Sequence, residues 1–307
     1  MTERIGFVGV GTMGQPMARN LLKAGFSVII SPHTNLQPVK ELEAAGARVV
    51  ATPAEVAAAA GAVVVTCLPN TRQVEEVLFG PNGLMAGAAP GLTVVDTSTI
   101  SPTSTQTFSA RVAEQDGTLL DAPMSGGQVG AVSGQLVFMV GGDKAAVDTC
   151  QPIFDAMGKK AYYVGTSGMG QTVKLCNNLM LGINLLGVCE AFTLGAKVGV
   201  DAATLAEVVQ ASSGGSAVIE RYFPNTILKD QYKPGFMLKL MCKDMGLALD
   251  LAREVGVPTF AGTVAGQVLN MVNTMGKGDD DFTVIATLLQ DVAGVVIGKA
   301  EEANAPA

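Results

Sequence analysis

The sequence predicts an α/β fold in which a doubly wound, mainly parallel sheet is followed by an all-helical domain. Three observations support this. Short apolar runs alternate with helical segments in the first half of the chain, strand signals are absent after Gly168, and long helical stretches follow. Near-continuous apolar strands separated by helices are typical of a parallel sheet covered on both faces. We therefore expect a sheet domain over residues 1–166 and a helical domain over residues 167–307.

The predicted strands are short and rich in β-branched residues, and they occupy residues 5–10, 27–30, 62–68, 92–98, 119–123, 136–142 and 161–165. After the first strand, Met13, Met17 and Leu21 recur at i, i+4 and i+8, which predicts a helix over residues 12–24. In the helical domain Asp201 is a candidate N-cap and Pro258 suits a first helical turn. Its helices are expected near residues 170–198, 201–211, 214–228, 236–255, 258–275 and 281–297.

Composition narrows the class of protein. Hydrophobic residues make up 48% of the 307 residues and charged residues 15%, which supplies enough apolar side chains for a large core. A net charge of −7 argues against a nucleic-acid partner. The apolar run at residues 179–196 contains Asn184 and Glu190, so we expect a buried helix rather than a membrane span.

Cysteine usage and the N-terminus indicate the compartment. The five cysteines are widely spaced without a CxxC pair, and the chain has one histidine, so we expect free thiols and no bound metal. A strand begins almost at once, so we also expect no signal peptide. These features favour a cytoplasmic location.

The segment Gly9-Val10-Gly11-Thr12-Met13-Gly14 has the pattern GxGxxG, between a predicted strand and a predicted helix. The first glycine permits a tight turn, the second lets the backbone approach a pyrophosphate, and the third allows close packing of helix on strand. Because strand, loop and helix agree, we expect a Rossmann-type dinucleotide site that includes Thr12 and Met13.

The end of the second strand normally selects the cofactor. A carboxylate there binds the ribose hydroxyls of NAD, while an arginine accepts the 2′-phosphate of NADP. This chain has Ser31, Pro32, His33 and Thr34 at that place, so the choice between NAD and NADP stays open. His33 has two interpretations, a phosphate contact and a solvated loop residue.

Two segments in the sequence suggest chemistry. One is the loop after a strand that contains Ser125, Gly126 and Gly127, with a hydroxyl and accessible backbone N–H groups. This loop has two interpretations, a binding site for a carboxylate and a flexible turn. Lys174 and Asn178 lie four residues apart on one face of a helix. A partly buried lysine can exchange an alcohol proton near neutral pH, whereas a lysine that extends to solvent has no such role.

Four motifs occur in order along the chain: GVGTMG (9–14), DAPMSGG (121–127), GMGQTVKLCNN (168–178) and KDMGLALD (243–250). With them the chain resembles the β-hydroxyacid dehydrogenase family, also called the 3-hydroxyisobutyrate dehydrogenase family. The resemblance implies an active site between a Rossmann domain and a helical domain, with Lys174 as catalytic acid/base assisted by Asn178. It further implies substrate carboxylate contacts from Ser125, Gly126 and Gly127, nicotinamide contacts from Thr99 and Lys243, and a cofactor groove lined by Leu68 and Pro69.

The expected activity is therefore NAD(P)-dependent interconversion of a small β-hydroxyacid and its semialdehyde or ketone. Residues 71–83, 95–102 and 233–244 look closest to tartronate-semialdehyde reductases, and Ser212–Ser216 is expected to influence substrate choice. Alternative substrates are 3-hydroxyisobutyrate, γ-hydroxybutyrate, glyoxylate and a sulfonated analogue. Lys174 argues against an imine reductase and against a non-catalytic dinucleotide-binding protein. The long apolar helices favour a homodimer or homotetramer.

Overall fold

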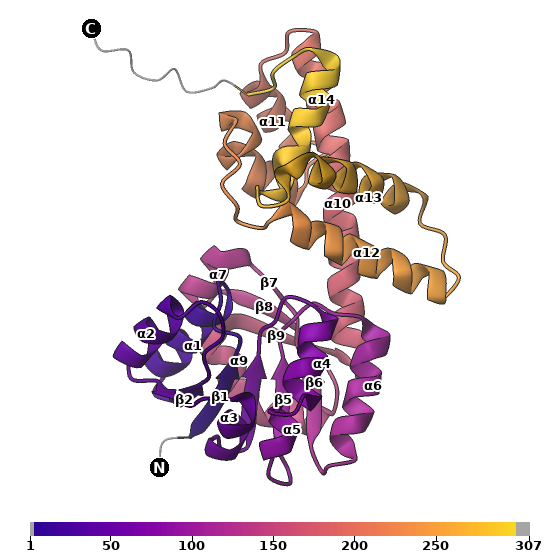
Figure 1. Cartoon of the computed structure of the whole chain (residues 1–307). Helices are drawn as coiled ribbons and strands as arrows, with labels where there is room; N and C mark the ends of the chain where they lie inside the picture. The colour runs from indigo at the N-terminus through magenta and orange to yellow at the C-terminus, as the bar shows by residue number, and fades with distance from the viewer. Residues whose placement is uncertain (1–2, 299–307) are drawn as a thin grey trace, which may run out of the picture. The chain divides into compact units, whose positions relative to one another are not determined.

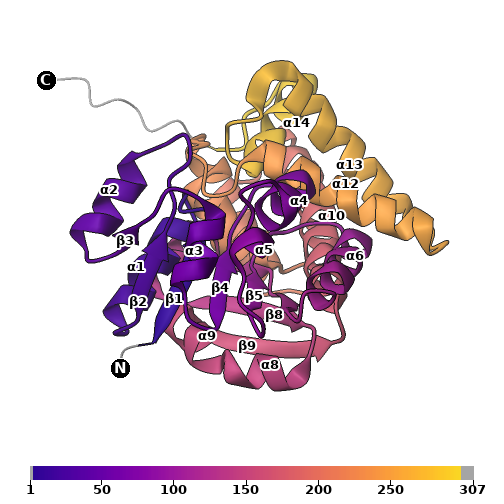
Figure 2. The same ribbon diagram turned by 60° about the horizontal axis from the view of Figure 1, so that its bottom comes forward.

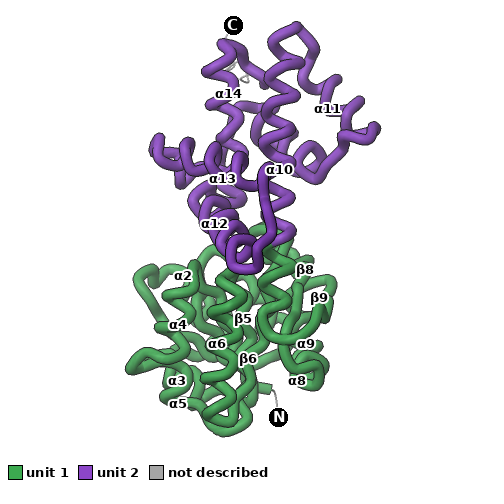
Figure 3. Tube along the Cα trace, turned by 90° about the vertical axis from the view of Figure 1, so that its right-hand side faces the viewer, with its two compact units in different colours: residues 1–175 green, residues 176–307 purple. Residues whose placement is uncertain are grey.

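The computed structural model describes residues 3–298. The chain forms two compact units that divide after Leu175 (Figure 3). The first contains the sheet and the second is helical, so the predicted fold class is confirmed. The long helix α10 (Met169–Lys197) begins in the sheet unit and continues into the helical unit. The boundary between functional domains at residue 166 stays a prediction.

The sheet lies in the first unit (Figure 1). Its strand order is β3-β2-β1-β4-β5-β6-β8-β7, with β9 beside β8. The pairings among β1 to β6 are parallel, whereas β8 runs antiparallel to β6 and β7. The strands are β1 (Arg4–Val8), β2 (Ser27–Ile30), β3 (Arg48–Val49), β4 (Val63–Thr66), β5 (Thr93–Asp96), β6 (Thr118–Asp121), β7 (Met124–Ser125), β8 (Leu136–Gly141) and β9 (Gly158–Gly165). The sequence did not indicate β3 and β7, because two residues are too few to show a strand pattern.

Helices cover both faces of this sheet (Figure 2). Alternate strand residues enter two separate cores: Val63 and Val65 pack with α1, α2 and α9, while Val64 packs with α3, α4, α5 and α6. The helices of this unit are α1 (Gly14–Lys23), α2 (Gln37–Ala44), α3 (Pro53–Ala59), α4 (Thr71–Phe79), α5 (Leu84–Gly87), α6 (Pro102–Ala113), α7 (Gly127–Ser133), α8 (Lys144–Thr149) and α9 (Gln151–Met157). The double burial explains why the strands are apolar along their whole length.

The carboxyl ends of the parallel strands are aligned. Val8 of β1 pairs with Thr66 of β4, Thr66 with Asp96 of β5, and Asp96 with Asp121 of β6. The strand order runs outward in opposite directions from β1 and β4, and open α/β sheets bind ligands at such a point. The loops after these strands therefore occupy the ligand-binding edge of the sheet.

The helical unit continues from α10 with α11 (Ala202–Gln210), α12 (Leu238–Glu254), α13 (Phe260–Val272) and α14 (Ile285–Ala293). Asp201 caps α11 as predicted, because its carboxylate accepts a hydrogen bond from the Thr204 N–H at 2.9 Å. The predicted helix at residues 214–228 is wrong. A π-helical turn (Val218–Tyr222) and two 3-10 turns (Phe223–Asn225 and Ile227–Lys229) take the place of one continuous helix, and Thr226 between the 3-10 turns has non-helical backbone angles, φ −127° and ψ −81°.

Helix α10 is long and apolar enough to cross a membrane by length and composition alone, and core helices of globular proteins also meet this criterion. Leu185, Cys189 and Phe192 of α10 are fully buried in the core of the helical unit. Phe192 contacts Phe223 there, with ring centroids 4.5 Å apart. Packing within the unit thus accounts for one face of the helix, while Met180 and Leu194 are exposed.

Candidate functional site

The glycine loop after β1 leaves open space at one position only of its three glycines. A Cβ on Gly9, which has φ 95°, would lie 2.2 Å from the Cys67 carbonyl oxygen, and a Cβ on Gly14 would lie 2.0 Å from the Gly9 carbonyl oxygen. Around Gly11 no atom lies within 4 Å of a Cβ. Thr12 is exposed and Met13 packs on the core. An open backbone at the start of α1 fits the pyrophosphate of a dinucleotide.

The segment after β2 carries the predicted selectivity residues. Ser31 is buried, while His33 and Thr34 are exposed, with the Thr34 hydroxyl 3.4 Å from Nδ1 of His33. These side chains offer hydrogen bonds and no carboxylate, which suits a ribose hydroxyl and a phosphate alike. The structure therefore fits either nicotinamide cofactor.

The loops after β4 and β5 are joined by hydrogen bonds. The Leu68 N–H donates to the Ser98 hydroxyl at 2.8 Å, and that hydroxyl donates to the buried Asp96 carboxylate at 2.6 Å. Leu68 and Thr99 are partly buried, and Pro69 is exposed. The predicted groove residues and Thr99 thus belong to two loops held together at the ligand-binding edge.

Ser125 ends β7, opposite Val137 of β8, and the two glycines after it are exposed. Gly126 and Gly127 have φ values of 135° and 60°, which glycine adopts without strain. No atom lies within 4 Å of a Cβ placed on Gly127. The loop therefore presents accessible backbone, as a carboxylate-binding concavity requires.

Lys174 is half-buried near the start of α10, and that start is held on the sheet by Asp121. The fully buried Asp121 carboxylate accepts hydrogen bonds from the N–H groups of Gly168 and Gln171, both at 2.9 Å. Burial raises the pKa of Asp121 to about 6, against the lowering effect of these hydrogen bonds, and Asp96 raises it further. The arrangement resembles an N-cap, supplied by a strand end instead of the preceding residue.

Gln171 is a second anchor that sequence reasoning missed. Its side chain is fully buried: Oε1 accepts from the Ile100 N–H at 3.0 Å, and Nε2 donates to the Ser98 carbonyl at 2.9 Å. Asp121 and Gln171 both lie inside motifs that the sequence displays, but their partners are far away along the chain. The sequence feature that could have identified Gln171 as an anchor is its polar side chain within an otherwise apolar stretch.

Asn178 belongs to the helical unit and is oriented by Asp244 of α12. Asn178 Nδ2 donates to Asp244 Oδ2 at 2.5 Å, and its Oδ1 accepts from Asn177 Nδ2 at 2.9 Å. The other oxygen of the buried Asp244 forms an ion pair with Lys243 Nζ at 2.9 Å. The structure thus joins two predicted residues, Asn178 and Lys243, through a carboxylate that the sequence did not single out.

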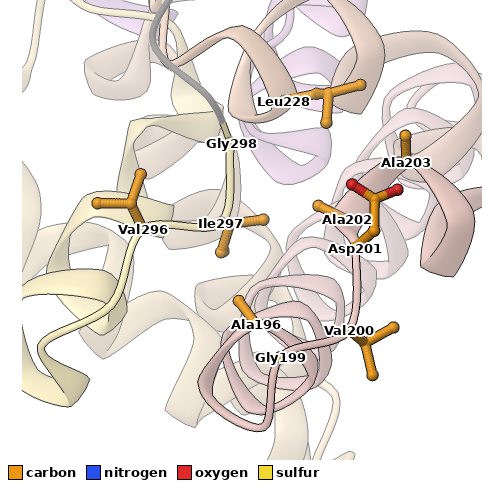
Figure 4. Close-up of a pocket in the computed structure, with 10 residues that line it drawn as sticks. All are labelled: Ala196, Gly199, Val200, Asp201, Ala202, Ala203, Leu228, Val296, Ile297 and Gly298. Carbon is orange, nitrogen blue, oxygen red and sulfur yellow. The ribbon is translucent and has the colours of Figure 1, made fainter.

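A cavity of about 480 Å³ lies elsewhere in the helical unit, near the end of α10 (Figure 4). Small and apolar side chains line it, and its one charged lining residue, Asp201, already caps α11. None of the predicted site residues lines it. Within residues 3–298 no group of three or more His, Cys, Asp and Glu side chains could hold a metal ion.

Two family models together match most of the chain. The model described as the NAD binding domain of 6-phosphogluconate dehydrogenase matches residues 4–165. The model described as NAD-binding of NADP-dependent 3-hydroxyisobutyrate dehydrogenase matches residues 168–289.

Individual relatives match along nearly the full length. An NAD-dependent L-serine dehydrogenase of Pseudomonas aeruginosa is 39% identical over 298 residues, covering 95% of this chain and 99% of that protein. A 2-(hydroxymethyl)glutarate dehydrogenase of Eubacterium barkeri is 37% identical, with 96% and 97% covered. The solved 3-hydroxyisobutyrate dehydrogenase of Mycobacterium tuberculosis with L-serine has a TM-score of 0.86 at 32% identity, with 94% and 100% covered. A Streptomyces aurantiacus imine reductase, at 22% identity, shares the fold alone.

Proposed function

The chain belongs to the β-hydroxyacid dehydrogenase family, and we propose that Lys174 carries the proton in the reaction that it catalyses. The predicted family, enzyme class and nicotinamide cofactor are confirmed: the protein is an NAD(P)-dependent oxidoreductase of small β-hydroxyacids. The supporting observation for Lys174 is its half-buried position on a helix whose start is bonded to the ligand-binding edge of the sheet.

In the oxidation, NAD or NADP would, when bound, take up a hydride from the alcohol carbon, so that the products would be an aldehyde, the reduced cofactor and one proton. The Lys174 amine takes the hydroxyl proton as the carbon–hydrogen bond breaks, and returns it in the reduction. Asn178, one turn further along α10 and oriented by Asp244, assists by holding the reacting groups in line. Thr99 and Lys243 serve the nicotinamide end of the cofactor in this proposal.

The proposed substrate is a carboxylic acid with a CH₂OH group on its α-carbon. The relatives are named for L-serine, 2-(hydroxymethyl)glutarate and 3-hydroxyisobutyrate, which share this group and differ in the other α-substituent. Glycerate, the reduced form of tartronate semialdehyde, has it too and is our first candidate. A panel of these acids with γ-hydroxybutyrate, assayed with NAD and with NADP, tests the class. Fastest turnover of γ-hydroxybutyrate, whose alcohol is one carbon further away, would contradict it.

The loop of Ser125, Gly126 and Gly127 is proposed to bind the substrate carboxylate. Its support is the accessible backbone at two consecutive glycines of positive φ. The methyl ester and the amide of the best substrate should lose most of kcat/KM, because they lack the charge that such a concavity prefers. Equal turnover of ester and free acid would count against this role.

The role of Lys174 is tested by Lys174→Ala. We expect kcat to fall by roughly 10²- to 10⁴-fold, the usual contribution of a general acid/base, while the Kd of the cofactor stays within about threefold. Lys197→Ala is the matched control, since Lys197 lies on the same helix and donates to the Ala293 carbonyl in the helical unit. Near-normal turnover of Lys174→Ala would refute the assignment.

We also propose a cytoplasmic homodimer or homotetramer that acts on small molecules, with no nucleic-acid or membrane partner, and with functional domains at residues 1–166 and 167–307. The free cysteines favour a reducing compartment. Phe260, Val264, Met271 and Met275 are exposed along α13 and the turn after it, and a second copy would cover such surface. Sedimentation equilibrium tests the assembly, and a monomer at micromolar concentration would contradict it.

A further inference from the structure

Gln171 brackets the predicted nicotinamide contact, Thr99. Its side-chain amide accepts from the N–H of Ile100, the residue after Thr99, and donates to the carbonyl of Ser98, the residue before it. Ile100 and Ser98 are both buried, so water cannot replace these hydrogen bonds cheaply. One side chain of α10 therefore holds the backbone on both sides of Thr99.

The same turn of α10 carries Lys174. Gln171 and Lys174 are three residues apart, hence on the same side of the helix and about 4.5 Å apart along its axis. Ser98 also accepts the Leu68 N–H on its hydroxyl. A continuous set of hydrogen bonds thus runs from the loop after β4, through the Thr99 loop, to the turn that presents the lysine.

The start of the helix cannot shift easily along the sheet. Asp121 accepts the N–H of Gly168, the residue before the helix, on one carboxylate oxygen and the N–H of Gln171, in the first turn, on the other. A Cβ on Gly170 would lie 2.4 Å from the Met139 carbonyl oxygen and 2.8 Å from Asp121 Oδ2, and a Cβ on Gly141 would lie 2.7 Å from Asp121 Oδ1. Backbone of α10 and of β8 therefore packs directly against the carboxylate.

We propose that Gln171 is a positioning residue for the reaction, which sets the turn carrying Lys174 against the Thr99 loop, with Asp121 fixing the start of that turn. The inference rests on the proposed role of Lys174. Gln171 itself contacts neither substrate nor cofactor in this proposal. Its effect on the rate passes through the placement of the Lys174 amine.

The main test compares Gln171→Met with Gln290→Met, using the acid of the panel that turns over fastest. Gln290 is also a buried glutamine, and its Oε1 accepts the Ile297 N–H at 2.7 Å in the helical unit. Gln171→Met should slow single-turnover hydride transfer roughly 10- to 100-fold, because small misplacements of reacting groups cost rates of this size. The fluorescence-measured Kd of NADPH or NADH should stay within about threefold of wild type. Gln290→Met should leave the rate within about twofold.

A double mutant separates positioning from general damage to the fold. In the Lys174→Ala background there is no amine to misplace, so adding Gln171→Met should reduce the residual rate by less than about twofold. The same loss in both backgrounds, or an unchanged rate in Gln171→Met alone, would overturn the inference. Near-normal turnover of Lys174→Ala refutes the proposed function itself, which is a different outcome.

Asp121→Asn provides a second variant if Gln171→Met folds poorly. It keeps one acceptor for the helix and should slow hydride transfer without weakening cofactor binding. Amide hydrogen exchange over residues 166–175 should become faster, while exchange over residues 181–197 stays as in wild type. Unchanged exchange and an unchanged rate would show that the carboxylate does not hold the start of the helix.

Discussion

Gly11 and Gly14 belong to one motif, and the structure predicts that alanine affects a different property at each position. A Cβ on Gly14 would lie 2.0 Å from the Gly9 carbonyl oxygen and 2.9 Å from the ring of Phe7. A Cβ on Gly11 would have no neighbour within 4 Å, and Gly11 has no positive φ. Gly14→Ala should therefore damage the fold, whereas Gly11→Ala should damage only cofactor binding.

The magnitudes follow from these contacts. The overlap at Gly14 should cost about 1–3 kcal/mol or more in the free energy of unfolding, as overpacking of a close contact does. At Gly11 the change in stability should stay within about 0.5 kcal/mol, as at open surface positions. The added methyl should separate the backbone from the pyrophosphate. Losing one hydrogen bond to a charged group costs about 1.5–3 kcal/mol, or roughly 10- to 100-fold in Kd.

Urea unfolding measures the first quantity, and fluorescence titration with NADH and NADPH measures the second. Gly187→Ala is the matched control, since Gly187 of α10 is exposed and also has no neighbour within 4 Å of a Cβ. It should leave the Kd unchanged. If Gly11→Ala bound both cofactors as tightly as wild type, the open space above Gly11 would not be the pyrophosphate site and the reasoning would fail.

Three further predictions concern buried groups. Burial raises the pKa of Asp121 from 3.8 to about 6, so the stability that its protonation provides is present below about pH 4 and is lost as the pH rises through 6. The wild-type free energy of unfolding should therefore fall by about 3 kcal/mol between about pH 4 and pH 7 through this group, and urea unfolding of Asp121→Asn should not show that fall. The same pH dependence in both proteins would contradict the prediction. Asp244→Asn removes the ion pair with Lys243 and leaves one oxygen where two now serve Lys243 and Asn178. It should lower the unfolding free energy by about 1–3 kcal/mol and reduce kcat, and wild-type values of both would exclude an orienting role. Phe192→Ala should cost about 3–5 kcal/mol in urea unfolding, because the ring is buried against Phe223, and a loss below about 1 kcal/mol would mean that the core closes over the cavity.

The sequence predicted the sheet and the long helices because their patterns are local. Alternating apolar strands and helical periodicity extend over four or more residues, and each long strand was found near its predicted bounds. The two-residue strands β3 and β7 exist through pairing with distant neighbours, which no local pattern records. The single helix expected at residues 214–228 is wrong for the opposite reason: the apolar pattern continues through Thr226, where the backbone leaves helical geometry.

The candidate site divides in the same way. Gly9, Gly11 and Lys174 could be named from motifs, because each motif is a short run of the chain. Asp121, Gln171 and Asp244 could not be assigned a role, since their hydrogen bonds join residues separated by 47 to 73 positions. The side chains that orient a site are thus less visible in one sequence than those that compose it.

The glycines of the motifs fall into two groups, those where a Cβ would clash with the protein and those where it would not. Gly9, Gly14 and Gly170 are each required by an atom of the protein that a Cβ would strike. Gly11 and Gly246 have neither such a neighbour nor a positive φ, and glycine inside a helix such as α12 costs about 1 kcal/mol relative to alanine. At both positions the structure leaves room for a partner to approach the backbone. For Gly11 the proposed partner is the cofactor pyrophosphate, and Gly246 lies one turn from Lys243, the predicted nicotinamide contact on α12.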